Sequence, residues 1–148
     1  MYIKGVFIMR ILRVDTNGEA RVISLNDETV EDTLHFAICQ EFGCVPSYPL
    51  IESGVWDEYD LSKETLIYLY AKDDVKGEPE NEYCCRIISE FSIPSNILGP
   101  VILVKYIRVG YTDNYVPCSM EKEEIEHLLT KIGVDEVTNL YPSGSERN

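Results

Sequence analysis

The sequence predicts a single α+β domain. We expect an N-terminal β-hairpin followed by an amphipathic helix, a mixed or antiparallel sheet of about 4–6 strands, and a C-terminal helix. Three observations favour this class: an Asn17-Gly18 turn between two strand-like runs, two stretches with apolar residues at helical spacing, and a length of 148 residues with 45% hydrophobic content that suits one core. We expect the domain to span residues 1–140 and residues 141–148 to form a flexible tail.

The hairpin is predicted from its turn and from the composition of its flanks. Residues 2–14 and 20–25 are rich in β-branched residues, which is typical of strands. Asn17 and Gly18 tolerate the positive φ angles of a type I′ turn, which joins antiparallel strands of matching twist. The sequence therefore predicts two paired strands around this turn.

An amphipathic helix is predicted after the hairpin. Asn26 or Asp27 can cap its first turn, and Gly43 suits the left-handed residue that ends a helix. Apolar residues at helical spacing form one stripe along it: Val30, Leu34, Ala37, Ile38 and Phe42.

The second half of the chain is predicted to contain further strands and a last helix. The acidic stretch 50–62 is expected to be irregular. A helix over residues 119–132 is indicated by Ser119 as N-cap, by early glutamates and by Gly133 at its end. Strands are expected where β-branched and aromatic residues gather: residues 65–71, 83–91 and 101–109.

Net charge narrows the classes of partner. The chain has 26 acidic and 13 basic residues, giving −13, and residues 26–64 hold ten acids against one base. Direct nucleic-acid binding is disfavoured because it depends on clustered Lys and Arg that neutralise phosphates. No apolar run approaches the roughly 18 residues of a membrane span, so we expect no membrane insertion. A protein partner, with a basic one favoured by the acidic stretch, fits this balance.

Cysteine usage favours a reducing compartment. The number of cysteines is odd, no C-x-x-C pair occurs, and the apolar N-terminus lacks a signal-peptide pattern. We therefore expect a soluble, intracellular protein with free thiols at Cys39, Cys44, Cys84, Cys85 and Cys118.

Catalytic and metal-binding patterns are weak. His35 and Cys39 are one helical turn apart and Cys44 follows, but the spacing matches no standard zinc module, and a buried thiol is the favoured interpretation. Cys118 precedes the last helix, yet His127 lies two turns along it, which disfavours a Cys–His nucleophile. Motifs for phosphate loops, zinc proteases and serine hydrolases are missing from the sequence. We expect no enzyme activity, no metal and no cofactor.

Aromatic residues indicate a partner-binding surface. Tyr106, Tyr111 and Tyr115 gather around Arg108, and Tyr and Arg are enriched at the energetic centres of interfaces. The alternative is that these tyrosines half-cover the core of the sheet. The predicted contact residues are Trp56, Tyr106, Arg108, Tyr111 and Tyr115, with the acidic Glu31, Asp32, Asp57 and Glu58.

One stretch resembles a known group of proteins. The segment Gly77-Glu78-Pro79-Glu80-Asn81-Glu82-Tyr83, then Pro94, then Leu98-Gly99-Pro100 before an apolar strand, is followed by an acidic amphipathic helix. From Gly77 to Gly133 this resembles small uncharacterised proteins of nucleocytoplasmic large DNA viruses, apart from a single Pro94 in place of a proline cluster and the inserted Cys84-Cys85. The resemblance implies a viral setting, in the virion or the host cytoplasm, and brings no functional residue with it.

Three functional hypotheses follow from these observations. The first is a non-enzymatic protein–protein interaction protein of a virus, acting as a minor virion component or as an adaptor in infected cells. The second is an acidic decoy or regulator that occupies a basic nucleic-acid-binding protein. The third is a small metal- or thiol-dependent enzyme using His35, Cys39 and Cys44. The sequence leaves the oligomeric state open.

Overall fold

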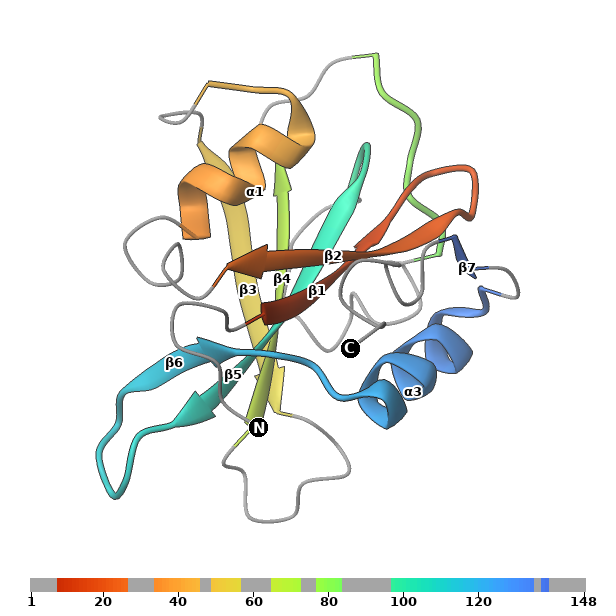
Figure 1. The fold of residues 1–148 in the computed structure, drawn as a ribbon. Helices are drawn as coiled ribbons and strands as arrows, with labels where there is room; N and C mark the ends of the chain where they lie inside the picture. The colour runs from red at the N-terminus through yellow and green to blue at the C-terminus, as the bar shows by residue number, and fades with distance from the viewer. Residues whose placement is uncertain are drawn as a thin grey trace.

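The computed structural model describes residues 8–26, 34–45, 49–56, 65–72, 77–83, 97–134 and 137–138. Within these ranges the chain forms strands and two helices (Figure 1). The strands are β1 Ile8–Val14, β2 Ala20–Asn26, β3 Leu50–Trp56, β4 Thr65–Lys72, β5 Val101–Arg108, β6 Tyr115–Cys118 and β7 Val137–Thr138. The helices are α1 Leu34–Phe42 and α3 Lys122–Ile132.

All of these strands belong to one sheet in the order β3-β4-β5-β1-β2-β7, with β6 also paired to β5. The pairs are antiparallel except for the two-residue β7, which runs parallel to β2. Strand β5 is shared along one edge: β1 pairs with residues 101–103 and β6 with residues 105–108. The predicted α+β fold with a mixed sheet is confirmed, and the short β7 is an addition to it.

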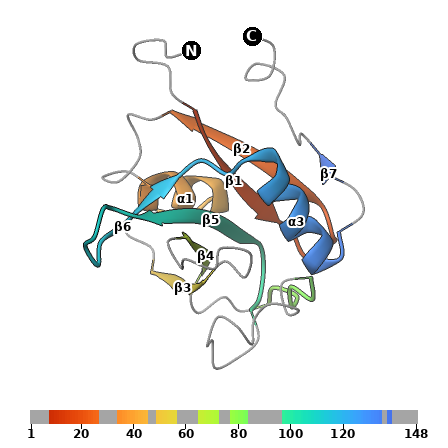
Figure 2. The same cartoon turned by 90° about the horizontal axis from the view of Figure 1, so that it is seen from below.

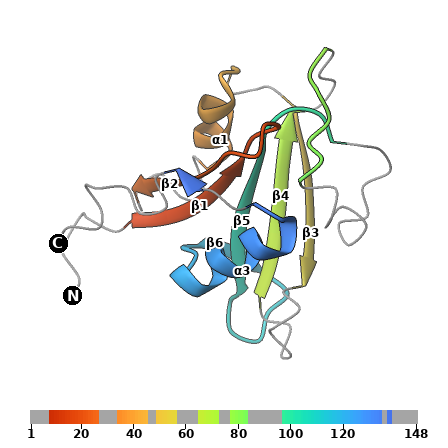
Figure 3. The same cartoon turned by 90° about the vertical axis from the view of Figure 1, so that its right-hand side faces the viewer.

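The two helices cover opposite faces of the sheet. Along β5, Val101 and Leu103 belong to the cluster that α3 covers, whereas Ile102 and Val104 belong to the cluster under α1. In Figures 1 and 3 the β1–β2 hairpin runs between the two helices and crosses β3, β4 and β5 steeply. A strand that is buried on both faces must be apolar at successive positions, which explains the apolar run in β5.

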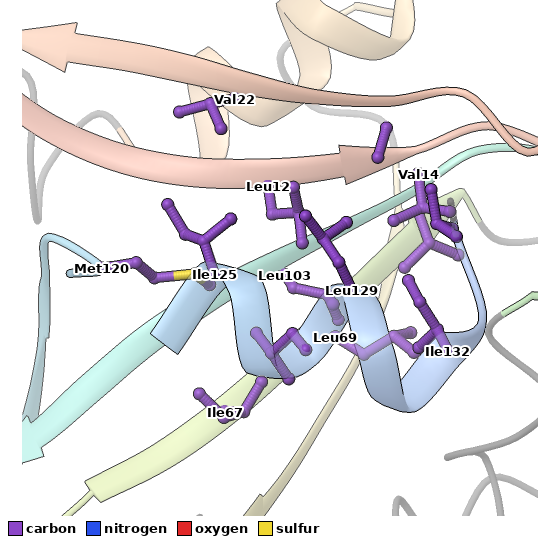
Figure 4. Packing of buried hydrophobic residues seen from close by; sticks show 14 of the residues in the cluster. Leu12, Val14, Val22, Ile67, Leu69, Leu103, Met120, Ile125, Leu129 and Ile132 are labelled. Atoms are coloured by element: carbon purple, nitrogen blue, oxygen red, sulfur yellow. The ribbon is translucent and has the colours of Figure 1, made fainter. Parts of the chain in front are cut away.

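Helix α3 carries the larger core. Ile125, Leu129 and Ile132 point toward Leu12 and Leu103 of the sheet (Figure 4). The predicted apolar stripe of this helix is confirmed, since its members Ile125, Leu128, Leu129 and Ile132 are all buried.

The two ends of α3 differ in how well they were predicted. Gly133 ends the helix at φ 80°, as expected. The prediction of Ser119 as N-cap is wrong, because Glu121 holds that position and its backbone N–H donates to Glu124 Oε1 at 2.7 Å. The Ser119 hydroxyl oxygen instead accepts the backbone N–H of Arg10 at 2.9 Å, which ties this segment to β1.

Two further predictions need correction. The stretch 50–62 is not irregular throughout, because its first seven residues form β3 and all of them pair with β4. Asn26 is the last residue of β2, opposite Ile8, and its predicted role as a helix cap depends on residues 27–33, which lie outside the described residues. The β1–β2 turn is a three-residue loop rather than type I′: Gly18 N–H donates to Asp15 O at 3.1 Å, and Gly18 itself has φ 91°.

Several predictions fall outside the described residues. These are the Asp27 cap, Val30 of the first helix, the greater part of the strand predicted at 83–91, and the tail at 141–148. Tyr83 itself lies in a turn. Neither described helix is long and apolar enough to cross a membrane.

Candidate functional site

A pocket of about 250 Å³ opens on the α1 face of the sheet. Strand register brings its walls together, because Glu52 of β3 pairs with Tyr70 of β4, and Tyr106 of β5 pairs with Pro117 of β6. Helix α1 supplies the remaining wall. The lining residues are Leu34, His35, Glu52, Tyr70, Tyr106 and Pro117.

Two tyrosines, Tyr70 and Tyr106, line this pocket, and the ring of a third, Tyr68, lies next to them. Tyr68 and Tyr70 are two residues apart on β4 and therefore share a face, with ring centroids 6.2 Å apart. The Tyr106 ring lies 4.4 Å from that of Tyr68, in a tilted arrangement. The hydroxyl groups of Tyr70 and Tyr106 are hydrogen-bonded to each other. The side chain of Tyr70 is buried and that of Tyr106 is half-buried, so the pair sits at the boundary between core and solvent.

The electrostatics of the pocket favour neutral phenols beside a carboxylate. Burial raises the pKa of Tyr70 far above its usual value, and the hydrogen bond between Tyr70 and Tyr106 and the charge of Glu52 add to the increase. Burial also raises the pKa of Tyr106, since the opposing effect of Tyr70 is smaller, and Glu52 contributes there too. A pair of hydroxyls joined by one hydrogen bond retains one proton and three lone pairs. The pocket therefore offers mainly acceptor oxygens and a negative charge.

The raised pKa values predict a loss of stability in alkali. A phenol whose pKa is higher in the fold than in the unfolded chain stabilises the fold fully below the unfolded pKa, and that contribution is lost as pH rises above about 10. Urea unfolding from about pH 8 to 11 should show this fall, and Tyr70→Phe should remove most of it. Tyr111→Phe is the matched control because Tyr111 is fully exposed. An unchanged slope in Tyr70→Phe would contradict the assignment.

The predicted contact residues separate into two places. Tyr106 faces the pocket. Arg108 and Tyr115 meet across the β5–β6 pair, where the Arg108 Nη2 and Nε atoms donate to the Tyr115 hydroxyl oxygen at 3.1 and 3.3 Å. The guanidinium also lies 5.7 Å from the Tyr115 ring centroid. Tyr111 is fully exposed in the connection between the two strands. The residues of the expected Tyr–Arg cluster therefore all belong to the β5–β6 hairpin. At the base of this hairpin, Tyr106 and Pro117 line the pocket.

The remaining predicted contacts are less defined. Trp56 ends β3 opposite Leu66, which in turn pairs with Tyr106, so β4 lies between Trp56 and Tyr106 in the sheet. The four acidic residues Glu31, Asp32, Asp57 and Glu58 lie outside the described residues. An acidic docking surface built from them stays a prediction.

The candidate metal ligands are not grouped. His35 lines the pocket, whereas Cys39 is fully buried, and the Cys44 thiol donates to the Cys39 carbonyl oxygen at 3.4 Å. Among the described residues no three His, Cys, Asp or Glu side chains are placed to hold a metal ion. Burial raises the pKa of Cys118, and the opposing charge of Lys105 is a smaller influence, which disfavours the thiolate form of this side chain.

Several residues of the site, Tyr68, Tyr70 and Glu52 among them, were not predicted as site residues from the sequence. Tyr68 and Tyr70 lie in a predicted strand, and their spacing of two residues was a usable signal that they share a face. Glu52 lies in the stretch expected to be irregular, so no local pattern placed it beside Tyr70. The pocket depends on the β3–β4 pairing, which is a non-local feature.

No protein-family model, curated protein or solved structure matches this chain. We therefore infer function from the pocket, the hairpin and the charges of the chain itself. The resemblance of the segment from Gly77 to Gly133 to viral proteins stays a prediction.

Proposed function

We propose that this chain is a non-enzymatic protein-binding module that docks its partner on the β5–β6 hairpin. The observation that carries the proposal is the exposed apolar surface of this hairpin. Ile107, Val109 and Tyr111 are 37%, 44% and 105% exposed, and they make up three of the five large hydrophobic residues exposed in the described part of the chain. Apolar and aromatic side chains gathered on one projecting element are typical of protein interaction sites.

The hairpin is held in shape by its own hydrogen bonds. Val109 N–H donates to Asn114 O at 2.9 Å, and the Thr112 hydroxyl donates to Val109 O at 2.6 Å. Together with the contacts between Arg108 and Tyr115, these bonds order the connection before any partner arrives. In Figure 2 the hairpin projects at the left of the view, whereas α3 lies at the right. A pre-ordered loop loses less conformational entropy on binding, which favours affinity.

The acidic balance of the chain supports a basic partner. With a net charge of −13, the chain attracts a positively charged protein and repels nucleic-acid phosphates. The decoy hypothesis predicts binding that weakens steeply with salt, whereas docking on an apolar hairpin weakens little. A salt titration of the complex therefore discriminates between the two hypotheses.

A viral setting is supported by the resemblance of the segment from Gly77 to Gly133. We place the module either in the virion as a minor component or in infected cells as an adaptor. Mass spectrometry of purified particles separates these two settings, since the chain is present in the particle in the first setting alone.

Replacing the hairpin side chains tests the docking element. The variant Ile107→Ser, Val109→Ser, Tyr111→Ser should lose the protein that the unchanged chain captures from the cells that naturally produce it, because the exposed apolar area is removed. Phe36→Ser with Val45→Ser is the matched control, since these two residues are similarly exposed on and just after α1. Quantitative mass spectrometry should show loss in the hairpin variant and retention in the control. Equal capture by both variants would overturn the proposal.

A further inference from the structure

We propose that the pocket between α1 and the sheet receives an arginine side chain of the protein that docks on the hairpin. This inference rests on the proposed function, because it supposes a protein partner on the β5–β6 hairpin. It adds the residue type that the partner must present.

The size and walls of the pocket suit one long side chain. Its volume of about 250 Å³ lies below the roughly 300–1,000 Å³ that is typical of small-molecule sites. Leu34 and Pro117 give it apolar walls, against which the methylene groups of an arginine can pack. Tyr70 and Tyr106 give it aromatic walls, against which a guanidinium is attracted.

The charges and acceptors in the pocket select a cation. The exposed Glu52 side chain makes no hydrogen bond or ion pair among the described residues, and Lys72, which lies diagonal to it in the β3–β4 register, forms no ion pair with it. The Tyr70–Tyr106 pair adds spare lone pairs beside this carboxylate. A guanidinium presents five N–H donors in a plane and no acceptor, so it complements a carboxylate and two phenol oxygens. An anion would meet Glu52 and be repelled.

The pocket borders the hairpin that carries the proposed docking element, on the face of β5 opposite to that of Ile107, which pairs with Val116. Tyr106 and Pro117, which line the pocket, are a pair at the base of the hairpin, and the Arg108–Tyr115 pair follows two residues further along on the same face. A partner that holds the hairpin on both faces, with Ile107 on one and Arg108 and Tyr115 on the other, would therefore reach the pocket with a side chain. This proximity favours an arginine of the partner over a free small cation.

An NMR titration of the full chain with a blocked Gly-Arg-Gly peptide tests the proposal. We expect amide shifts to change around the lining residues, with a dissociation constant on the order of 1 mM for so small a probe. Glu52→Gln should weaken binding about tenfold, because the charge-assisted hydrogen bonds are lost, and Tyr106→Phe should weaken it less. Glu126→Gln removes the same charge from the exposed side of α3 and should leave binding unchanged.

Three results would overturn the inference. The first is equal binding of a blocked Gly-citrulline-Gly peptide, which has a similar shape without the charge. The second is unchanged binding in Glu52→Gln. The third is stronger binding of spermidine than of the arginine peptide at the same residues, which would assign the pocket to a free polyamine. If hairpin-dependent capture persists while the arginine peptide fails to bind, the proposed function stands and this inference falls.

Discussion

Replacing Asn81 by aspartate should lower the free energy of unfolding by about 3–5 kcal/mol at neutral pH. Asn81 is completely buried, and its Nδ2 group donates to the carbonyl oxygens of Val14 and Gly99, both at 3.0 Å. Its backbone N–H donates to Ile97 O at 2.8 Å. The Asn81 side chain therefore links the end of β1 to the segment that precedes β5, and the Asn81 backbone adds a second bond to that segment. In Asn81→Asp an oxygen faces those carbonyl oxygens, and a negative charge is introduced at a completely buried position.

The pH dependence of this variant tests the mechanism. Burial beside carbonyl oxygens should raise the pKa of the introduced carboxyl group above its value of about 3.9 in the unfolded chain. The loss of stability is then present near neutral pH and shrinks as pH falls below the raised pKa, because the protonated group is neutral and donates once. Urea unfolding of the variant and the unchanged chain at about pH 7 and about pH 4 measures this. Asn114→Asp, on the exposed hairpin connection, is the control; an equal loss at both pH values in Asn81→Asp would contradict the account.

The second large effect is expected at Gly18. Gly18→Ala should lower the free energy of unfolding by about 2–4 kcal/mol, as the sum of backbone strain and overpacking. The backbone of Gly18 has φ 91°, which residues with a Cβ rarely accept. A Cβ at this position would lie 2.7 Å from the Tyr83 hydroxyl oxygen and 2.8 Å from the Tyr83 Cζ. The Tyr83 ring therefore packs too close to the turn to leave room for a Cβ at position 18.

The variant Gly77→Ala serves as a reference that separates the cost of backbone strain at Gly18 from the cost of the clash with Tyr83. Gly77 has φ 82°, but a Cβ at this position would have no atom of the described residues within 4 Å, so alanine there meets backbone strain alone. Thermal unfolding should show a clearly smaller loss for Gly77→Ala, of about 1–2 kcal/mol. In a Tyr83→Ala background the additional loss caused by Gly18→Ala should fall to the Gly77 value. Equal losses at Gly18 and Gly77 in the unchanged background would show that Tyr83 does not constrain the turn.

The elements that were predicted well from the sequence are those with local signals. Helix α3 has its apolar stripe, its early glutamates and Gly133 within a few turns, and the β1–β2 hairpin has Asn17 and Gly18 beside β-branched flanks. The turn of the β1–β2 hairpin differs from the predicted type I′ because a hydrogen bond between Asp15 and Glu19 closes the loop one residue outside the predicted turn. The cap at Ser119 was mispredicted because a distant backbone group, Arg10 N–H, takes the serine oxygen.

Strand β3 and the pocket show what local patterns leave out. Residues 50–56 include Glu52 and Gly54, which are poor strand formers, and all seven residues pair with residues 66–72 of β4. The tyrosines around Arg108 are close together in the sequence and could be predicted as a cluster. The hydrogen bond between Tyr106 and Tyr70, however, depends on the register of β4 and β5. Contacts between strands that are distant in sequence decide the site, and single-strand periodicity does not encode them.

The most direct test of the central claim is site-specific photo-crosslinking in the cells that naturally produce the chain. A photoreactive phenylalanine analogue at position 111 lies on the exposed hairpin, and the same analogue at position 36 lies on the exposed side of α1. Docking on the hairpin predicts that one protein is crosslinked from position 111 and not from position 36. Crosslinking of the same protein with equal yield from both positions, or of no protein from position 111, would contradict it.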